Sequence, residues 1–202
     1  MENVAGIILA GGRASRMGGH DKALTELGGR PLLLHVANRL APQVAPIAVN
    51  ANGDAGRLAG FGLPVIPDDD EDFLGPLAGI LAGLRWAATL DLPPDSLATI
   101  AVDTPFFPVD LVARLRSAQT RADMIVLAAT HGRRHPTFGL WPLETLPRLA
   151  AHMEEGGSLK VADFVDTLPN AVVDFNAAGG HDPFFNVNTP DDLAEAERIL
   201  RG

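Results

Sequence analysis

A loop rich in glycine and basic side chains directly follows the short apolar segment Val4–Leu9. The loop opens with Gly11 and Gly12. The stretch Arg13–Lys22 then carries three basic residues and one aspartate, a local charge of +2 in a chain whose net charge is -9. Because glycine has no Cβ, the backbone N–H groups beside it can approach an anion closely and form a concave binding site. The loop therefore predicts a site for phosphate groups rather than a surface that is merely basic.

Two common nucleotide-binding loops do not fit this stretch. A Walker A loop requires G-x-x-x-x-G-K-[ST], but His20 follows Gly19 and Ala23 follows Lys22. A dinucleotide-binding loop requires G-x-G-x-x-G, and Arg13 stands where its second glycine is needed. The ATP-hydrolase and dehydrogenase interpretations are therefore weak.

Asp103 is a candidate metal ligand because it directly follows the apolar run Leu97–Val102. Mg²⁺ in proteins typically takes one or two carboxylates and completes its shell with substrate phosphates and water. A carboxylate at the end of a buried strand, above a ligand crevice, suits that role. The sequence Asp-Thr-Pro also initiates turns well, so its position alone leaves a turn residue as the alternative.

The acidic run Asp68–Asp72 follows the apolar run Leu63–Ile66. Most of it is expected to be a solvated loop, and it is no EF-hand because Phe73 stands at the required glycine position. Asp68 itself can point into the crevice. A carboxylate there can accept a pair of adjacent N–H donors from a bound base. Asp68 is thus a candidate for base selection, and Asn50 is a similar candidate for base or ribose, with an Asx-turn as its alternative.

Apolar runs alternate with helical patterns along the chain, which predicts an α/β fold with a mostly parallel sheet and helices on both faces. Ligands in such folds bind beyond the carboxyl ends of the strands. The predicted strands are Val4–Leu9, Pro46–Asn50, Leu63–Ile66, Leu97–Val102, Met124–Ala128 and Phe184–Val187. The predicted helices are Pro31–Leu40, Ala55–Ala59, Leu77–Ala88 (apolar on most faces), Pro108–Ala118, Leu143–Met153 and Asp191–Leu200, the last capped by Thr189. The least regular segment, about 133–180, is expected to form a subsidiary lobe over the site.

The composition limits the classes of function. The chain has 202 residues, of which 47% are hydrophobic and 20% charged, as expected of a single globular domain. Its net charge of -9 argues against nucleic-acid or anionic-membrane binding. The lack of cysteine excludes a disulfide framework and a thiol nucleophile, and no apolar run approaches the roughly 18 residues that span a bilayer. We expect one domain, residues 1–202, located in the cytoplasm, with no nucleic-acid or membrane partner.

The glycine-rich loop is similar to the nucleotidyltransferase signature L-A-x-G-x-x-x-R-M-G followed by a lysine. Further similarities cover Pro31-Leu32, Asn50-Ala51-Asn52, Gly75-Pro76-Leu77-Ala78-Gly79, Asp103-Thr104-Pro105-Phe106, His135-Pro136 and Asn186-Val187-Asn188-Thr189-Pro190. Through these motifs the chain resembles the molybdenum cofactor guanylyltransferases, the MobA-like branch of the nucleotidyltransferases. The loop signature is shared with sugar-nucleotide and cytidylyl transferases, whereas the Gly11-Gly12 pair together with the Asn186–Pro190 motif is more specific.

The resemblance implies a three-layer Rossmann-like nucleotidyltransferase fold. It also implies transfer of GMP from GTP to molybdopterin, carrying molybdenum as Mo-molybdopterin, which forms the guanine dinucleotide cofactor and releases pyrophosphate. The N-terminal half, about 1–105, would bind GTP, and the C-terminal half, about 106–202, would face the pterin. The implied cofactor is Mg²⁺. Other cofactor-biosynthesis proteins and molybdoenzyme chaperones are further candidate partners.

The resemblance also implies roles for individual residues. The catalytic residues are expected to be Arg16, Lys22 and Asp103, with Asp103 as the metal ligand. The expected nucleotide-binding residues are Leu9, Ala10, Gly11, Gly12, Lys22, Asn50, Asp68, Gly75 and Asp103. The expected pterin-side residues are His135, Asn186 and Asn188, and either asparagine is a candidate second metal ligand. The family often carries arginine where Gly53 stands, and this departure puts one base or phosphate contact in doubt.

Two other functions stay open on the sequence alone. One keeps the fold and changes the substrates, with cytidylyl transfer to molybdopterin or nucleotidyl transfer to a sugar phosphate. The other is a nucleotide-binding adaptor without catalysis. The presence of both Lys22 and Asp103 favours an enzyme over an adaptor.

Overall fold

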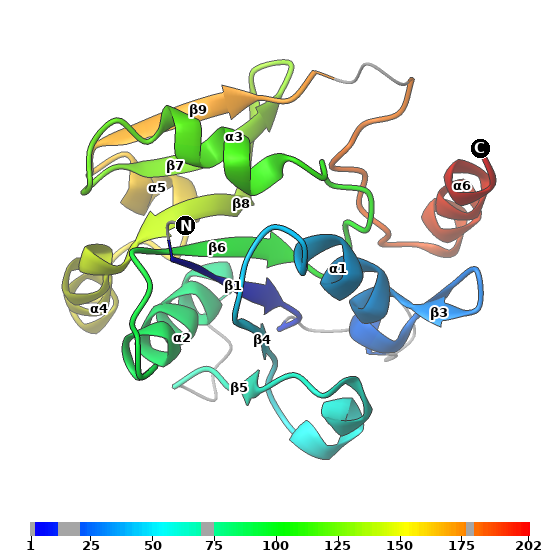
Figure 1. Cartoon of the computed structure of the whole chain (residues 1–202), viewed down its shortest axis with the longest axis horizontal. Helices are drawn as coiled ribbons and strands as arrows, with labels where there is room; N and C mark the ends of the chain where they lie inside the picture. Colours follow the sequence, from blue (N-terminus) through cyan, green and yellow to red (C-terminus); the bar gives the residue numbers. More distant parts are fainter. Residues whose placement is uncertain (1–2, 12–20, 70–74, 177–179) are drawn as a thin grey trace.

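The computed structural model describes residues 3–11, 21–69, 75–176 and 180–202. Within these residues, seven strands form a central sheet of order β5-β4-β1-β6-β8-β7-β9 (Figure 1). Every neighbouring pair in it is parallel except the two that involve β8, which is antiparallel to β6 and β7. The strands are β1 (Val4–Leu9), β4 (Ile47–Asn50), β5 (Val65–Ile66), β6 (Ser96–Ala101), β7 (Ile125–Thr130), β8 (Arg133–Pro142) and β9 (Asn170–Asp174). The expected α/β fold with a mostly parallel sheet is confirmed.

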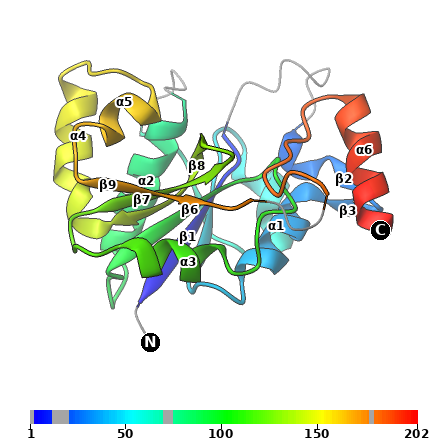
Figure 2. The same cartoon turned by 90° about the horizontal axis from the view of Figure 1, so that it is seen from above.

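Helices cover both faces of this sheet, giving three layers (Figure 2). On one face, α1 and α3 pack against sheet residues such as Ile8, and on the other α2, α4 and α5 pack against residues such as Ile7. Neighbouring residues of β1 therefore face opposite cores, which is why the whole strand is apolar and buried. The helices are α1 (Leu32–Leu40), α2 (Pro76–Ala88), α3 (Leu111–Ala118), α4 (Leu146–Glu154), α5 (Val161–Val165) and α6 (Pro190–Arg201), with 3₁₀ turns η1 (Lys22–Leu24), η2 (Ala55–Phe61) and η3 (Leu143–Thr145).

The C-terminal helix α6 lies at one end of the molecule, beside the small hairpin of β2 (Glu26–Leu27) and β3 (Arg30–Pro31) (Figures 1 and 2). A separate apolar cluster that includes Leu27, Val187 and Ala196 joins them. Thr189 caps α6 as expected, and Pro190 occupies its first turn. None of the helices in the described ranges is long and apolar enough to cross a membrane.

Phe184–Val187 is not a strand, so that prediction is wrong. Phe184 sits in a turn in which the Asp182 side chain accepts a hydrogen bond from its backbone N–H at 2.9 Å. Its ring packs against Phe138 and Phe175 at centroid distances of 4.8 and 5.7 Å. The apolar pattern here reflects burial of aromatic side chains without a backbone ladder.

The segment 133–180 does not form the expected subsidiary lobe. Its strands β8 and β9 belong to the central sheet, and α4 and α5 cover one face of that sheet. β7 and β8 are joined by a tight turn at His131 and Gly132, both with positive φ, a conformation typical of two-residue hairpins. Polar residues along the first half of β8 hide this strand from a search for apolar runs.

Candidate active site

A cavity of about 550 Å³ opens at the carboxyl ends of β1, β4, β5 and β6. This is the place where open parallel sheets bind their ligands. The N-terminus of α2 and the middle of β8 complete its wall. The residues that line it are Leu9, Ala10, Gly11, Asp21, Lys22, Asn50, Asn52, Arg57, Asp68, Gly75, Pro76, Ala101, Val102, Asp103, Thr137 and Asn186.

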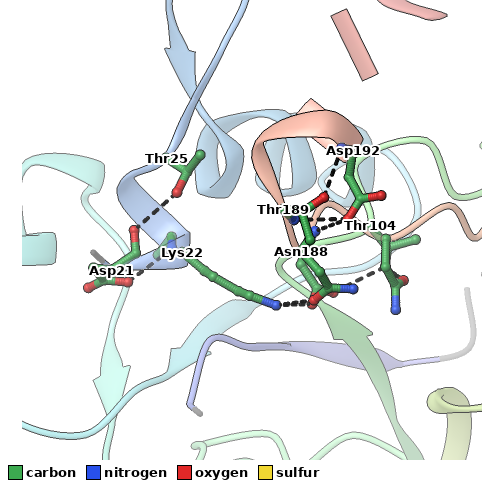
Figure 3. Close-up of polar contacts among 10 residues, drawn as sticks. Asp21, Lys22, Thr25, Thr104, Asn188, Thr189 and Asp192 are labelled. Atoms are coloured by element: carbon green, nitrogen blue, oxygen red, sulfur yellow. Dashed lines mark hydrogen bonds and ion pairs between the residues drawn. The ribbon is translucent and has the colours of Figure 1, made fainter. Parts of the chain in front are cut away.

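Lys22 and Asp103 form an ion pair in this wall, although 81 residues separate them in the sequence. The Nζ of Lys22 lies 2.9 Å from Oδ2 of Asp103 and also donates a hydrogen bond to Oδ1 of Asn188 (Figure 3). Both partners of the ion pair are partly exposed, with 27% and 18% of their side chains accessible. An ammonium group has three N–H donors, and contacts with the described residues use two of them, which leaves one for a ligand.

The position of Lys22 is set by the turn that contains it. Asp21 precedes η1, and its Oδ1 accepts a hydrogen bond from the backbone N–H of Ala23 at 2.9 Å. Its other carboxylate oxygen lies 2.5 Å from Nε of Arg57 in η2. Asp21 thus ties the start of η1 to a neighbouring wall of the cavity and holds Lys22 in place beside it.

Asp103 stands two residues beyond the end of β6, and the C-terminal segment is fastened to the same point. The backbone N–H of Val187 donates to the Asp103 carbonyl at 2.8 Å. The hydroxyl of the buried Thr104 lies 2.6 Å from Oδ1 of Asn186 and 3.2 Å from Oδ1 of Asp103. Asn186 and Asn188 are thereby brought to the Lys22–Asp103 pair from the far end of the chain.

Asp68 lies on another side of the cavity, between two asparagines. Nδ2 of the buried Asn50 donates to one carboxylate oxygen at 2.7 Å, and Nδ2 of Asn52 donates to the other at 2.8 Å. Oδ1 of Asn52 in turn accepts the backbone N–H of Asp68 at 2.7 Å. The carboxylate is therefore fixed in one orientation by side chains that follow β4.

The Asn50 side chain fits in its place because two residues beside it, Gly11 and Gly79, have no Cβ. A Cβ at Gly11 would lie 3.2 Å from Oδ1 of Asn50, and a Cβ at Gly79 would lie 2.9 Å from its Cγ and closer still to Oδ1. Gly75, which also lines the cavity, has a φ of 77° just before α2. Glycine adopts such a φ without the strain that a side chain would add.

His135, expected on the pterin side, is not among the residues that line this cavity. Its Nε2 lies 2.7 Å from the Thr130 hydroxyl, and its ring stacks on Phe184 at 4.4 Å. Burial lowers the pKa of His135 below its ordinary value of 6.5, which favours the neutral form of the ring. Thr137, two residues further along β8, lines the cavity instead.

Four polar or charged cavity residues were not predicted as site residues: Asp21, Asn52, Arg57 and Thr137. Asn52 had a usable signal, because it stands in the quoted Asn50-Ala51-Asn52 motif. Arg57 had none, since a lone arginine in a predicted surface helix is common. Its Nη1 lies 3.9 Å from where a Cβ at Gly53 would be, so a guanidinium occupies the neighbourhood of the missing arginine. Gly12 and Arg16, which the sequence places in the site, lie outside the described residues.

The described part of the cavity wall carries three carboxylates, Asp21, Asp68 and Asp103, against the cations Lys22 and Arg57. Further positive charge is therefore needed before a triphosphate can bind. No cluster of three or more His, Cys, Asp or Glu side chains within the described ranges could enclose a metal ion. A single carboxylate with amide oxygens nearby fits Mg²⁺ held jointly with substrate phosphates, because that ion prefers hard oxygen donors.

The family model and the curated relatives that match this chain point to the same family. Residues 6–169 match the family described as the MobA-like NTP transferase domain. Among curated proteins, the molybdenum cofactor guanylyltransferase of Mesorhizobium japonicum is 46% identical, over 98% of this chain and 97% of its own length. The protein of the same name from Bradyrhizobium sp. is 48% identical, over 97% and 92%.

Two solved structures show how widely the fold is used. The molybdopterin-guanine dinucleotide biosynthesis protein A of Archaeoglobus fulgidus shares it with a TM-score of 0.77 and 23% identity, covering 98% of each chain. The 4-diphosphocytidyl-2C-methyl-D-erythritol synthase of Anaerococcus prevotii has a TM-score of 0.75 at 14% identity, covering 100% of this chain and 99% of its own. The fold is therefore shared by a protein whose name points to a cytidine nucleotide.

The packing of Gly79 against Asn50 predicts an unusual response to alanine. In a helix interior, Gly→Ala is normally favourable by up to about 1 kcal/mol. At Gly79 the added Cβ would displace the Asn50 side chain, so we expect a net loss of about 1–3 kcal/mol in the free energy of unfolding and weaker nucleotide binding. Urea denaturation and calorimetric titration measure the two effects. Gly60→Ala, where a Cβ meets nothing within 4 Å, is the control, and an equally stable Gly79→Ala protein would contradict the interpretation.

Proposed function

Because the chain belongs to the MobA-like NTP transferase family, we propose that it transfers GMP from GTP to molybdopterin, forming the guanine dinucleotide cofactor and releasing pyrophosphate. The observation that carries this proposal is near-full-length identity of 46–49% to proteins named molybdenum cofactor guanylyltransferase. The cavity at the carboxyl ends of the strands supports it, because it gathers a lysine, a carboxylate and amide side chains.

The reaction needs alignment and charge neutralisation more than proton transfer. The attacking group is the terminal phosphate of the pterin, which is already an anion near pH 7, so no general base is required. Two anions must nevertheless approach each other, and one pair of unit charges 4 Å apart is worth about 4 kcal/mol at an effective dielectric of about 20. Fixed cations that favour the transition state over the separate reactants therefore supply the main catalytic effect.

Lys22 is the described cation best placed for this role. Two of its N–H donors are used by Asp103 and Asn188, which fix the ammonium group over the cavity. The third is available to a phosphate oxygen, where it would stabilise charge that develops on the departing pyrophosphate. Arg16 is proposed as a further cation for the phosphates.

Asp103 is proposed to hold Mg²⁺, with the amide oxygen of Asn186 or Asn188 as a candidate second ligand. The bound ion would supply positive charge to the triphosphate oxygens. In this arrangement Asp103 places its carboxylate at the end of β6, and Thr104 orients the Asn186 amide beside it.

Asp68 is proposed to select the base. Asn50 and Asn52 hold its carboxylate in one orientation, and the oxygens keep lone pairs that can accept the N1–H and N2–H₂ donors of guanine. Leu9, Ala10, Gly11, Gly12 and Gly75 would supply backbone contacts to the nucleotide.

The pterin is proposed to approach from the C-terminal half, where Asn186 and Thr137 line the cavity. Asn188 stands at the same side through its contact with Lys22. His135 would contribute indirectly, because its ring stacks on Phe184 and would hold that side chain in place. The division into a nucleotide half and a pterin half of one domain, the cytoplasmic location and the additional protein partners stay predictions.

Measurement of pyrophosphate release with each of the four nucleoside triphosphates tests the proposed function. We expect release with GTP and Mg²⁺ only when molybdopterin is present. Omission of the metal or of the pterin provides the controls. Faster release with CTP or UTP would overturn the guanine assignment, and no release with any nucleotide would favour an adaptor.

Substitution of Asp68 by asparagine tests base selection. The new NH₂ group faces the amide donors of Asn50 and Asn52 and cannot accept the guanine donors, so we expect the GTP preference over CTP in kcat/KM to fall about tenfold or more. Asp69→Asn is the matched control, because Asp69 pairs with Arg85 instead of lining the cavity. Unchanged selectivity in a folded Asp68→Asn protein would rule out this role.

Lys22→Ala should reduce turnover more than nucleotide affinity. If the ammonium acts mainly on charge in the transition state, kcat falls about 100-fold, whereas the Kd for GTP changes little. The chain has two lysines, and the second, Lys160, is exposed and distant from the cavity, so Lys160→Ala serves as the control. A turnover number equal to that of the unmodified enzyme would exclude the proposed role.

A further inference from the structure

Three consecutive residues before α6 are each fixed to a different part of the molecule. The Asn186 side chain is held by Thr104, and the Val187 N–H is held by the Asp103 carbonyl. The Asn188 N–H donates to Oδ2 of Asp192 at 2.9 Å. Figure 3 shows the third of these attachments, with Asn188 between Lys22 on one side and Asp192 on the other.

We propose that Asp192 is a positioning residue for Lys22: its carboxylate fixes Asn188, whose amide oxygen in turn holds the Lys22 ammonium over the cavity. This inference rests on the proposed catalytic role of Lys22. It gives α6 a part in the reaction, although α6 contributes no residue to the cavity wall within the described ranges.

Asp192 has more contacts than a helix cap requires. In the capping box, Oδ2 of Asp192 accepts the backbone N–H of Thr189 at 2.9 Å, and the Thr189 hydroxyl accepts the N–H of Asp192 at 3.1 Å. The additional bond from the Asn188 N–H lies outside that box. One oxygen thus sets both the start of the helix and the residue before it.

The negative charge of Asp192 strengthens the hydrogen bonds by which its carboxylate fixes Asn188 and Thr189. Its backbone hydrogen bonds and the nearby Lys22 favour the ionised form and, despite the opposing effect of partial burial, lower the pKa of Asp192 below its ordinary value. An ionised carboxylate binds the two N–H groups more strongly than a neutral acceptor would. The ammonium group is therefore drawn towards the α6 side of the site as well as towards Asp103.

The matched family domain ends at residue 169, so this segment lies beyond it. Asn188 and Asp192 lie some 20 residues beyond that point. Their link to Lys22 is the hydrogen bond between Asn188, which stands just before α6, and Lys22 in η1, two segments that the chain brings together from its opposite ends (Figure 1).

The two lysines of the chain allow a test without substrate. Trace labelling with acetic anhydride, followed by peptide mass spectrometry, gives the labelling rate of Lys22 relative to the exposed Lys160 in the same molecule. We expect Asp192→Ala to raise this ratio about threefold or more, because the ammonium loses part of its fixed environment.

Thr189→Ala is the matched control. It removes the other half of the capping box and should lower the melting temperature to a similar extent as Asp192→Ala, because both remove a helix-capping side chain. It leaves the Asp192–Asn188 bond in place, so its labelling ratio and kcat should equal those of the wild type. An equal rise in the ratio in both variants, or no rise in Asp192→Ala, would overturn the inference.

Turnover with GTP, Mg²⁺ and molybdopterin provides the second readout. We expect kcat of Asp192→Ala to fall about tenfold, a size typical of residues that orient a functional side chain, with the KM for GTP changed far less. Asp192→Glu, which can keep a capping box, should restore much of the activity. Loss of kcat without restoration by glutamate would count against positioning. Failure of the proposed function would appear as an inactive wild type, while the labelling ratio would still decide the role of Asp192.

Discussion

The site depends on one electrostatic constraint, which is that an acidic protein must hold two anionic phosphate groups close to each other. The chain carries a net charge of -9, and the described cavity wall has more carboxylates than cations. Positive charge must therefore be concentrated and fixed in place. The Lys22–Asp103 pair meets the second of these needs in the free protein: it carries no net charge, but it fixes the ammonium group at the cavity wall. A partly exposed pair of this kind adds little to stability, so its value lies in the position that it gives to Lys22.

The parallel sheet brings distant parts of the chain to the same place as Lys22. β1, β4, β5 and β6 all end at the same edge, so the side chains that follow them meet without any being close in sequence. The C-terminal segment reaches the same edge by a different means. It contributes no strand there but is fastened through the Asp103 carbonyl, Thr104 and the capping box of α6. The reacting side of the molecule is thus built from both ends of the chain.

The sequence predicts the elements that are buried on both faces or clearly amphipathic. β1 and the apolar α2 are found where expected, because the hydrophobicity of each segment and the spacing of its apolar residues both predict the same element. β8 and β9 were missed, because polar residues stand at the start of β8 and at both ends of β9. The antiparallel register of β8 is in addition set by β6, a partner distant in sequence. Lys22, Asp103, Asn50 and Asp68 could be named, because each directly follows a glycine-rich loop or an apolar run. Arg57 and Asp192 could not, because their contacts with Asp21 and Asn188 arise only in the folded chain and no local pattern marks them. Asn52 stands in the quoted Asn50-Ala51-Asn52 motif, but its contact with Asp68 is seen only in the structure.

The choice of base cannot come from the fold, because a structure whose name points to a cytidine nucleotide shares it with a TM-score of 0.75. It must lie in a few side chains at the edge of the sheet. The Asn50–Asp68–Asn52 arrangement has the properties that such a choice requires. Its carboxylate is oriented before the ligand arrives, so little side-chain entropy is lost on binding. A base without adjacent donors would desolvate that carboxylate and leave its remaining lone pairs unsatisfied, a larger penalty than the loss of an ordinary contact. In the proposed role of Asp68, discrimination follows from the cost of the wrong base as much as from the attraction of the right one.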